Sequence, residues 1–202
     1  MLQYKTIHPG TLQLLKDLQG LPLFQETRLV GGTSLALQLG HRNSVDLDFF
    51  GKVEAPSEAI RDALSVGHTL TVVNESKNIN IYLVDGVKVD IVNYRYEWID
   101  DPVSGDGFLL AGIKDIAAMK IAAIVGRGTK KDFIDLHFLL RHFSLKEILD
   151  LYMQKYPDGS MFVAMKSLSY FEDAEPDPMP VMFESVSWET VKDSIRQALL
   201  SL

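Results

Sequence analysis

RLVGGTSLALQLGHRNSVDLDFF, from Arg28 to Phe50, is the stretch that decides the fold. It contains a glycine pair, Gly31 and Gly32, followed by an apolar pattern with helical spacing that stops at Gly40. The last seven letters, SVDLDFF, alternate apolar and acidic residues in the manner of a half-buried strand. The stretch therefore predicts a glycine turn, a short helix and then a strand that carries two aspartates.

The two aspartates of this strand are candidate metal ligands. Because side chains alternate along a strand, Val45, Leu47 and Phe49 should point one way. Asp46 and Asp48 should then share the other face, with Cα atoms about 6.5 to 7 Å apart. That spacing lets carboxylates converge on two ions about 3.5 to 4 Å apart, as in a magnesium site. A solvated strand face is the simpler alternative.

A third carboxylate is available in VKVDIVNY, where Val89 and Ile91 should face the core and Asp90 the opposite side. If this strand neighbours the first, Asp46, Asp48 and Asp90 gather on one surface. Like charges that close are costly unless a cation neutralises them. The three aspartates therefore form a candidate magnesium site.

The glycine turn itself is a candidate phosphate site. Gly31, Gly32 and Thr33 precede a helix, so their backbone N–H groups and the helix N-terminus can hold phosphate oxygens. Glycine pairs also simply make turns, and Thr33 or Ser34 fits the role of helix N-cap. The position next to the aspartate strand favours the phosphate reading. His41 and Arg42 are further candidates to contact phosphate or to support the carboxylates.

Around this stretch, strands come first and helices last. A helix is expected within 8–21, and another within Ala55–Ala63 with Ser57 as N-cap. Asp85-Gly86 indicates a type I′ hairpin between two strands. After the turn-rich DPVSGDG the chain reads as helical. The order favours an α+β fold with a small mixed β-sheet, divided into a sheet domain over 1–106 and a helical domain over 107–202 that completes the nucleotide site.

The predicted helices carry further charged residues that are candidates for the nucleotide site. Lys120 lies among Ala, Met and Ile in DIAAMKIAAIVGRG, so it must either extend to solvent as a partly exposed lysine or meet an anion such as a triphosphate. Asp132 fits an N-terminal cap of the T-x-x-D kind after Thr129. The cluster Arg127, Lys130 and Lys131 could contact phosphates, although a solvated helix end is the commoner case.

Composition limits the remaining classes of function. The 202 residues are 47% hydrophobic, which suits a globular protein, and no apolar run is long enough to cross a bilayer. The N-terminus lacks the apolar region of a signal peptide, so we expect a cytoplasmic location without membrane contact. The absence of cysteine excludes disulfides and thiolate sites, and the five histidines lack metal-ligand spacing. A net charge of −7 argues against a broad grip on nucleic acid but allows a local patch.

Together these blocks resemble the AbiEii/AbiGii toxin family of nucleotidyltransferase-like proteins. The likeness rests on GGTSLALQLGHRNSVDLDFF, VKVDIVNY, DIAAMKIAAIVGRGTKKDFIDLHFLL and SLSYFEDAEPDPMP, in this order over nearly the whole chain. The family belongs to the polymerase-β-like nucleotidyltransferase superfamily. The wider superfamily usually has Gly-Ser where this chain has Gly32-Thr33, a change that keeps the hydroxyl.

The resemblance implies a role for each matching residue. Gly31, Gly32 and Thr33 match the glycine-turn motif that binds nucleotide. Asp46, Asp48 and Asp90 match the metal carboxylates. Lys120 and Asp132 match two later positions that the family assigns to nucleotide binding and catalysis.

The function implied by the resemblance is Mg²⁺-dependent transfer of NMP from an NTP to an acceptor hydroxyl, with an RNA such as tRNA as the acceptor. The family's toxins are paired with a DNA-binding antitoxin of the AbiEi type, which would be the protein partner. Two alternatives stay open: a nucleotide-binding module that has lost catalysis and contacts a partner protein, and a nucleotidyltransferase that modifies protein hydroxyls.

Overall fold

The computed structural model describes all residues from 1 to 202, and they divide into two compact units. A sheet unit comprises Met1–Arg95 and Pro102–Ala111, and a helical unit comprises Tyr96–Asp101 and Gly112–Leu202. The predicted α+β class with a small mixed sheet is confirmed. No helix is long and apolar enough to span a membrane.

The sheet unit contains seven strands and three α-helices, joined with two short 3₁₀ turns, Tyr4–Thr6 and Pro22–Phe24. Its helices are α1 (Pro9–Gln19), α2 (Gly31–Leu39) and α3 (Ser57–Leu64). Its strands are β1 (Thr27–Leu29), β2 (Leu47–Gly51), β3 (Leu70–Glu75), β4 (Ile79–Val84), β5 (Val87–Asn93), β6 (Val103–Gly105) and β7 (Phe108–Leu110).

The strands form one sheet in the order β3-β4-β5-β2-β1-β7-β6. The central pair, β2 and β5, is parallel, whereas β1 runs antiparallel to β2 and β4 runs antiparallel to β5. Asp85 and Gly86 join β4 to β5 with φ angles of 50° and 81°, so both residues are left-handed, as the predicted type I′ hairpin requires.

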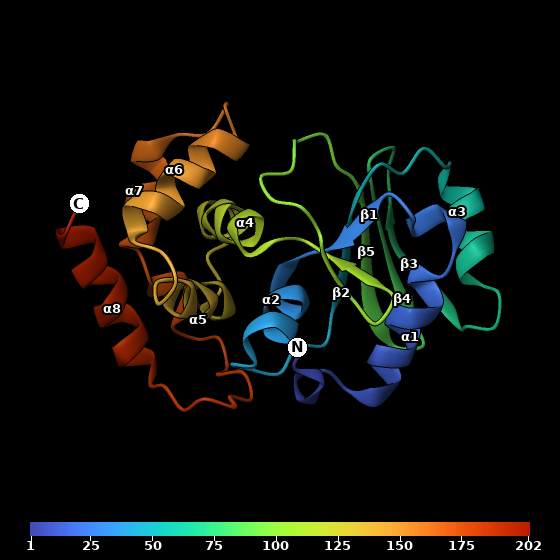
Figure 1. The fold of residues 1–202 in the computed structure, drawn as a ribbon, viewed down its shortest axis with the longest axis horizontal. Coiled ribbons are helices and arrows are strands. Elements are labelled where there is room, and N and C mark those ends of the chain that lie inside the picture. Colours follow the sequence, from blue (N-terminus) through green and yellow to red (C-terminus); the bar gives the residue numbers. More distant parts are fainter. The chain divides into compact units, whose positions relative to one another are not determined.

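One face of the sheet packs against helices α1 and α3, which Figure 1 shows beside it. Apolar side chains from the helices, including Leu15 and Ile60, share a buried core with alternate residues of the strands. The prediction of Ser57 as N-cap of α3 is wrong, because the helix is capped by Pro56 and Ser57 is its first residue. The Ser57 hydroxyl lies 2.7 Å from the side-chain oxygen of Asn80 on β4 instead.

The helical unit consists of five α-helices and one 3₁₀ turn, Glu172–Ala174. The helices are α4 (Ile113–Gly126), α5 (Lys130–Leu139), α6 (Leu145–Lys155), α7 (Met161–Leu168) and α8 (Trp188–Leu200). The rings of Phe133, Phe171 and Trp188 pack together, with centroids 4.9 to 6.0 Å apart.

A buried ion pair attaches the segment Tyr96–Asp101 to this unit. Asp115 on α4 and Lys155 on α6 are both fully buried and lie 2.7 Å apart. Asp115 accepts backbone N–H bonds from Ile99 and Asp100, and Lys155 donates to the carbonyl of Glu97. Each charge therefore has several hydrogen-bond partners, which is the condition for burying it.

Candidate active site

The predicted glycine turn is the first turn of helix α2. Gly31 has a φ angle of +67°, and a Cβ atom there would come within 2.3 Å of Oδ2 of Asp48. A Cβ atom at Gly32 would come within 2.3 Å of Nη2 of Arg42. The two glycines thus allow a carboxylate and a guanidinium group to approach the backbone, and any side chain would push these groups away.

The N-terminus of α2 carries no capping side chain. The N-cap residue is Val30, so the alternative of Thr33 or Ser34 as N-cap is wrong, and both lie within the helix. The Thr33 hydroxyl lies 2.9 Å from Oγ of Ser44 and donates to the backbone carbonyl of Asp46. A helix N-terminus whose N-cap residue supplies no side-chain acceptor is an arrangement that commonly binds anions.

Asp48 and Asp90 lie side by side on the sheet. They are register partners on the parallel strands β2 and β5. Their strand neighbours on the other face are fully buried, namely Leu47, Phe49, Val89 and Ile91. The two carboxylates therefore occupy the face opposite the core, where both residues are half-buried.

Asp46 comes just before this strand. Strand β2 begins at Leu47, later than SVDLDFF suggested, so alternation does not extend back to residue 45. The prediction that Val45 points the same way as Leu47 and Phe49 is wrong, since those two are fully buried and Val45 is 52% exposed. The hydrogen bond from Thr33 fixes the backbone of Asp46, and this contact ties the predicted carboxylate strand to the glycine turn.

The carboxylate oxygens on this face are suitable ligands for a hard cation such as Mg²⁺. Nζ of Lys88 lies 2.6 Å from both oxygens of Asp90, so a positive charge already contacts one of the two paired carboxylates. No group of three histidine or acidic side chains is arranged to hold a metal. Magnesium is usually bound through one or two carboxylates together with substrate phosphates and water. The oxygen donors of Asp48 and Asp90 fit that chemistry.

Lys120 and Asp132 meet in the helical unit. The Lys120 ammonium lies 3.0 Å from Asp132 and 2.6 Å from Asp135, and all three side chains are buried. The alternative of a partly exposed lysine is therefore wrong. Sequence reasoning missed Asp135, although its i+3 spacing from Asp132 places both carboxylates on one side of α5.

Asp132 is also bound by two neighbours from its own helix start. Nε of Arg127 lies 3.0 Å from its carboxylate, and the Thr129 hydroxyl donates to it at 2.7 Å. Burial by itself raises the pKa of Asp132, but the charges of Lys120 and Arg127 and these hydrogen bonds outweigh burial and hold the pKa well below its ordinary value. Asp132 is thus an anion that keeps two basic side chains in place.

The basic cluster after α4 is only partly available to ligands. Lys130 is buried, and its ammonium donates to the backbone carbonyls of Glu175 and Asp177. It joins α5 to the loop before α8, so the reading of Lys130 as part of a solvated helix end is wrong. Lys131 is exposed.

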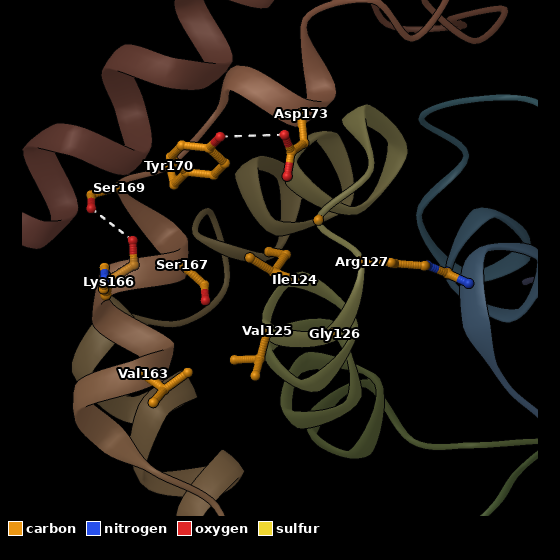
Figure 2. Close-up of a pocket in the computed structure, with 11 residues that line it drawn as sticks. Ile124, Val125, Gly126, Arg127, Val163, Lys166, Ser167, Ser169, Tyr170 and Asp173 are labelled. Carbon is orange, nitrogen blue, oxygen red and sulfur yellow. Dashed lines mark hydrogen bonds between the residues drawn. The ribbon is translucent and has the colours of Figure 1, made fainter.

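The helical unit also contains a cavity of about 550 Å³ between the end of α4 and α7 (Figure 2). Apolar side chains such as Ile124 and Val163 form part of its wall, and Tyr170 and Asp173 contact each other at its edge. The side chain of Arg127 points away from the cavity (Figure 2). Of the candidates named from the sequence, Arg127 alone is among the residues around this space.

The structure thus brings the predicted residues together in two groups. Gly31, Asp48 and Asp90 meet in the sheet unit. Their charged neighbours are Arg42, a candidate from the sequence, and Lys88, which sequence reasoning missed. Lys120 and Asp132 meet in the helical unit.

Known proteins are similar to this chain in sequence and in fold. A family model described as "Nucleotidyl transferase AbiEii toxin, Type IV TA system" matches residues 13–201. The uncharacterized protein aq_aa25 of Aquifex aeolicus (strain VF5) is 36% identical over 193 residues, which cover 92% of each chain.

Two solved structures are similar to the chain in fold. The nucleotidyltransferase toxin MenT4 of Mycobacterium tuberculosis H37Rv superposes with a TM-score of 0.64 at 20% identity, covering 94% of this chain and 81% of that one. JHP933 of Helicobacter pylori superposes with a TM-score of 0.60 at 22% identity, covering 96% and 92% of the two chains.

Proposed function

The chain belongs to the AbiEii family of nucleotidyltransferase toxins from type IV toxin–antitoxin systems, and from this premise we propose that it transfers NMP from an NTP to a hydroxyl of RNA with the aid of Mg²⁺. Membership makes it a toxin of the nucleotidyltransferase class that uses an NTP and is paired with an antitoxin. The metal and the acceptor are the specific parts of the proposal.

One observation carries the proposal, namely the register pairing of Asp48 with Asp90 beside the glycine turn. Two carboxylates on one face of a sheet, next to an uncapped helix N-terminus, supply metal ligands and a phosphate site at the same place. Magnesium held by Asp48 and Asp90 together with substrate phosphates and water would supply charge neutralisation for the transferred phosphoryl group, and the family resemblance adds Asp46 as a further ligand.

The chain's own residues have distinct roles in this proposal. The N–H groups of Gly31, Gly32 and Thr33 bind the triphosphate. The acceptor hydroxyl oxygen forms a bond to the α-phosphorus, the bond from that phosphorus to the bridging oxygen breaks, and pyrophosphate leaves. The hydroxyl proton passes to the carboxylate of Asp90, which acts as the general base.

Lys120 and Asp132 complete the proposed set. In the structure, Lys120 and Arg127 balance Asp132 and Asp135, so this cluster has no net charge. The family resemblance assigns Lys120 and Asp132 to nucleotide binding and catalysis, and two carboxylates hold the Lys120 ammonium in a fixed position for that role.

The test uses purified protein, Mg²⁺, each α-labelled NTP and total RNA. We expect label on RNA with the native chain and none with Asp48→Asn. A matched control is Asp62→Asn, which makes the same chemical change at an exposed site on α3 and should keep full activity. Equal labelling by the native and Asp48→Asn chains would remove Asp48 from the mechanism.

Two alternatives give different results in the same assay with lysate added. Label on protein rather than RNA would indicate a protein-modifying nucleotidyltransferase. Magnesium-dependent binding of NTP without label on any acceptor would indicate a nucleotide-binding module that acts through a partner protein.

A further inference from the structure

The face of the sheet that carries the carboxylates also carries a row of apolar and aromatic residues. Because β4, β5, β2 and β1 are neighbours, their residues line up across the sheet. Asp48 is paired with Asp90, and Asp90 with Ile81. Two residues along the strands, a second row follows on the same face, which we call the Phe50 row: Arg28, Phe50, Val92 and Ile79.

The Phe50 row has the chemistry of a surface that binds unpaired bases. Phe50 is half-buried and packs against Tyr94, with ring centroids 5.2 Å apart. Ile79 is 44% exposed at one end of the row, and Arg28 supplies a positive charge at the other end. Proteins bind single-stranded nucleic acid by stacking bases on aromatic side chains beside basic groups that contact the backbone.

The position of the glycine turn decides which ligand the row would take. Strands β1 and β2 are antiparallel, so the chain passes from Arg28, opposite Phe50, to Val30, whose N–H donates to the carbonyl of Asp48 at 2.8 Å. The glycine turn therefore lies toward the Asp46 end of the strand. The Phe50 row lies on the other side of Asp48.

Nucleotidyl transfer requires the attacking and leaving oxygens to be roughly in line through the α-phosphorus. If the triphosphate lies on the glycine turn, pyrophosphate leaves on that side of the Asp48–Asp90 pair. The attacking hydroxyl must then arrive from the side of the Phe50 row. The two rows are about 6.6 Å apart along the strands, which is comparable with the reach from a base to the 3′ hydroxyl of its own ribose.

We propose that the Phe50 row binds the 3′-terminal nucleotide of a single-stranded RNA acceptor, with the base on Phe50, Val92 and Ile79 and the phosphate backbone toward Arg28. This assignment rests on the proposed function, because the direction of attack follows from the placement of the triphosphate. It also accounts for a nucleic-acid contact in a chain of net charge −7, since a stacking surface needs few positive charges.

Two exposed residues of β4 provide a matched pair for the test. Ile79 lies in the Phe50 row, whereas Leu83, 37% exposed, pairs with Lys88 on the opposite side of the carboxylate pair. Both side chains lie on the same face and on the same strand. Ile79→Glu and Leu83→Glu therefore introduce the same charge at similar exposure on opposite sides of the reacting centre.

The primary measurement is the fluorescence anisotropy of a short labelled single-stranded RNA with a free 3′ hydroxyl, titrated with protein in Mg²⁺ without NTP. We expect Ile79→Glu to weaken RNA binding by roughly tenfold or more, because it replaces an apolar contact with a carboxylate that repels the RNA backbone. Leu83→Glu should stay within about twofold of the native chain, because its carboxylate lies away from the proposed RNA site. Phe50→Leu, which keeps an apolar side chain but removes the ring, should also weaken RNA binding several-fold. NTP affinity should be unchanged in all three variants.

Three results would overturn the assignment. Equal loss of RNA binding in Leu83→Glu and Ile79→Glu would mean that the added negative charge weakens binding from either position, and that the RNA does not bind specifically at the Phe50 row. Loss of NTP affinity with normal RNA binding would place the base of the NTP on the row. Absence of RNA binding by a native chain that labels protein would exclude an RNA acceptor. Failure of the proposed function is distinct, because it appears as the lack of any Mg²⁺-dependent transfer by the native chain.

Discussion

Replacing Gly31 with alanine should destabilise the protein in two ways, by straining the backbone of the glycine turn and by displacing the carboxylate of Asp48. At a φ angle of +67° an alanine costs about 1 to 2 kcal/mol relative to a right-handed conformation. The new Cβ would also lie 2.3 Å from Oδ2 of Asp48, well inside van der Waals contact, so the carboxylate must move. Overpacking of this kind costs a further 1 to 3 kcal/mol, roughly.

The matched control is Gly67→Ala. Gly67 has a similar φ angle of +81°, but a Cβ atom there would meet nothing within 4 Å. This variant should lose about 1 kcal/mol from backbone strain alone. Gly31→Ala should lose about 2 to 5 kcal/mol in total. Urea unfolding of the native chain and the two variants measures these differences.

Transfer activity gives the more specific readout of the same pair. Moving a positioned group by about 1 Å can reduce a reaction rate by roughly 100-fold. Gly31→Ala should therefore reduce label transfer by about that factor under conditions where it remains folded, and Gly67→Ala should retain native activity. The reasoning is refuted if both variants lose the same stability and keep the same activity, since the contact with Asp48 would then have no consequence.

Three further predictions concern the helical unit. Asp115→Asn should lower the free energy of unfolding by about 3 to 5 kcal/mol, because it leaves the fully buried Lys155 without its counter-charge; chemical denaturation measures the loss, and a change below about 1 kcal/mol would contradict the role assigned to the pair. Lys120→Met should lower the free energy of unfolding by a similar amount, about 3 to 5 kcal/mol, because two buried carboxylates would then lie close together without the lysine. In a double-mutant cycle, adding Asp135→Asn should restore part of this lost stability. Burial and the neighbouring Arg141 lower the pKa of His137, so its contribution to stability is present above the unfolded pKa of about 6.5 and is lost as pH falls toward the folded value; His137→Gln should flatten the loss of thermal stability between neutral and mildly acidic pH, and an unchanged slope would refute it.

Local sequence signals explain which hairpins could be predicted. Asp85-Gly86 joins two strands of six and seven residues, whose alternation is long enough to recognise. Asp106 and Gly107 have the same left-handed geometry, with φ angles of 52° and 87°. The strands that they join, β6 and β7, have three residues each, too few to show a period of two. The second hairpin was therefore missed although its turn residues are of the same type.

Pairing between distant segments could not be read from local patterns. The alternation in VKVDIVNY predicts which face Asp90 occupies, but its partnership with Asp48 depends on a parallel pairing between strands separated by helix α3 and two other strands. Similarly, the sequence indicated that Lys120 must reach solvent or meet an anion, and it gave no sign of the buried role of Lys155. Their partners, Asp135 and Asp115, come from other helices, and nothing in the sequence pairs them.

The glycine pair also shows why a motif alone does not establish a phosphate site. The contacts of Gly31 with Asp48 and of Gly32 with Arg42 would require glycine even if no phosphate bound there. Loss of activity in Gly31→Ala is thus consistent with displacement of the carboxylate alone. The two requirements separate when NTP affinity is measured with a metal chelator present, because the carboxylate then repels the nucleotide rather than binding it through a cation. Under these conditions Asp48→Asn should bind NTP at least as well as the native chain, whereas Gly31→Ala should bind it less well only if the turn itself holds the phosphates.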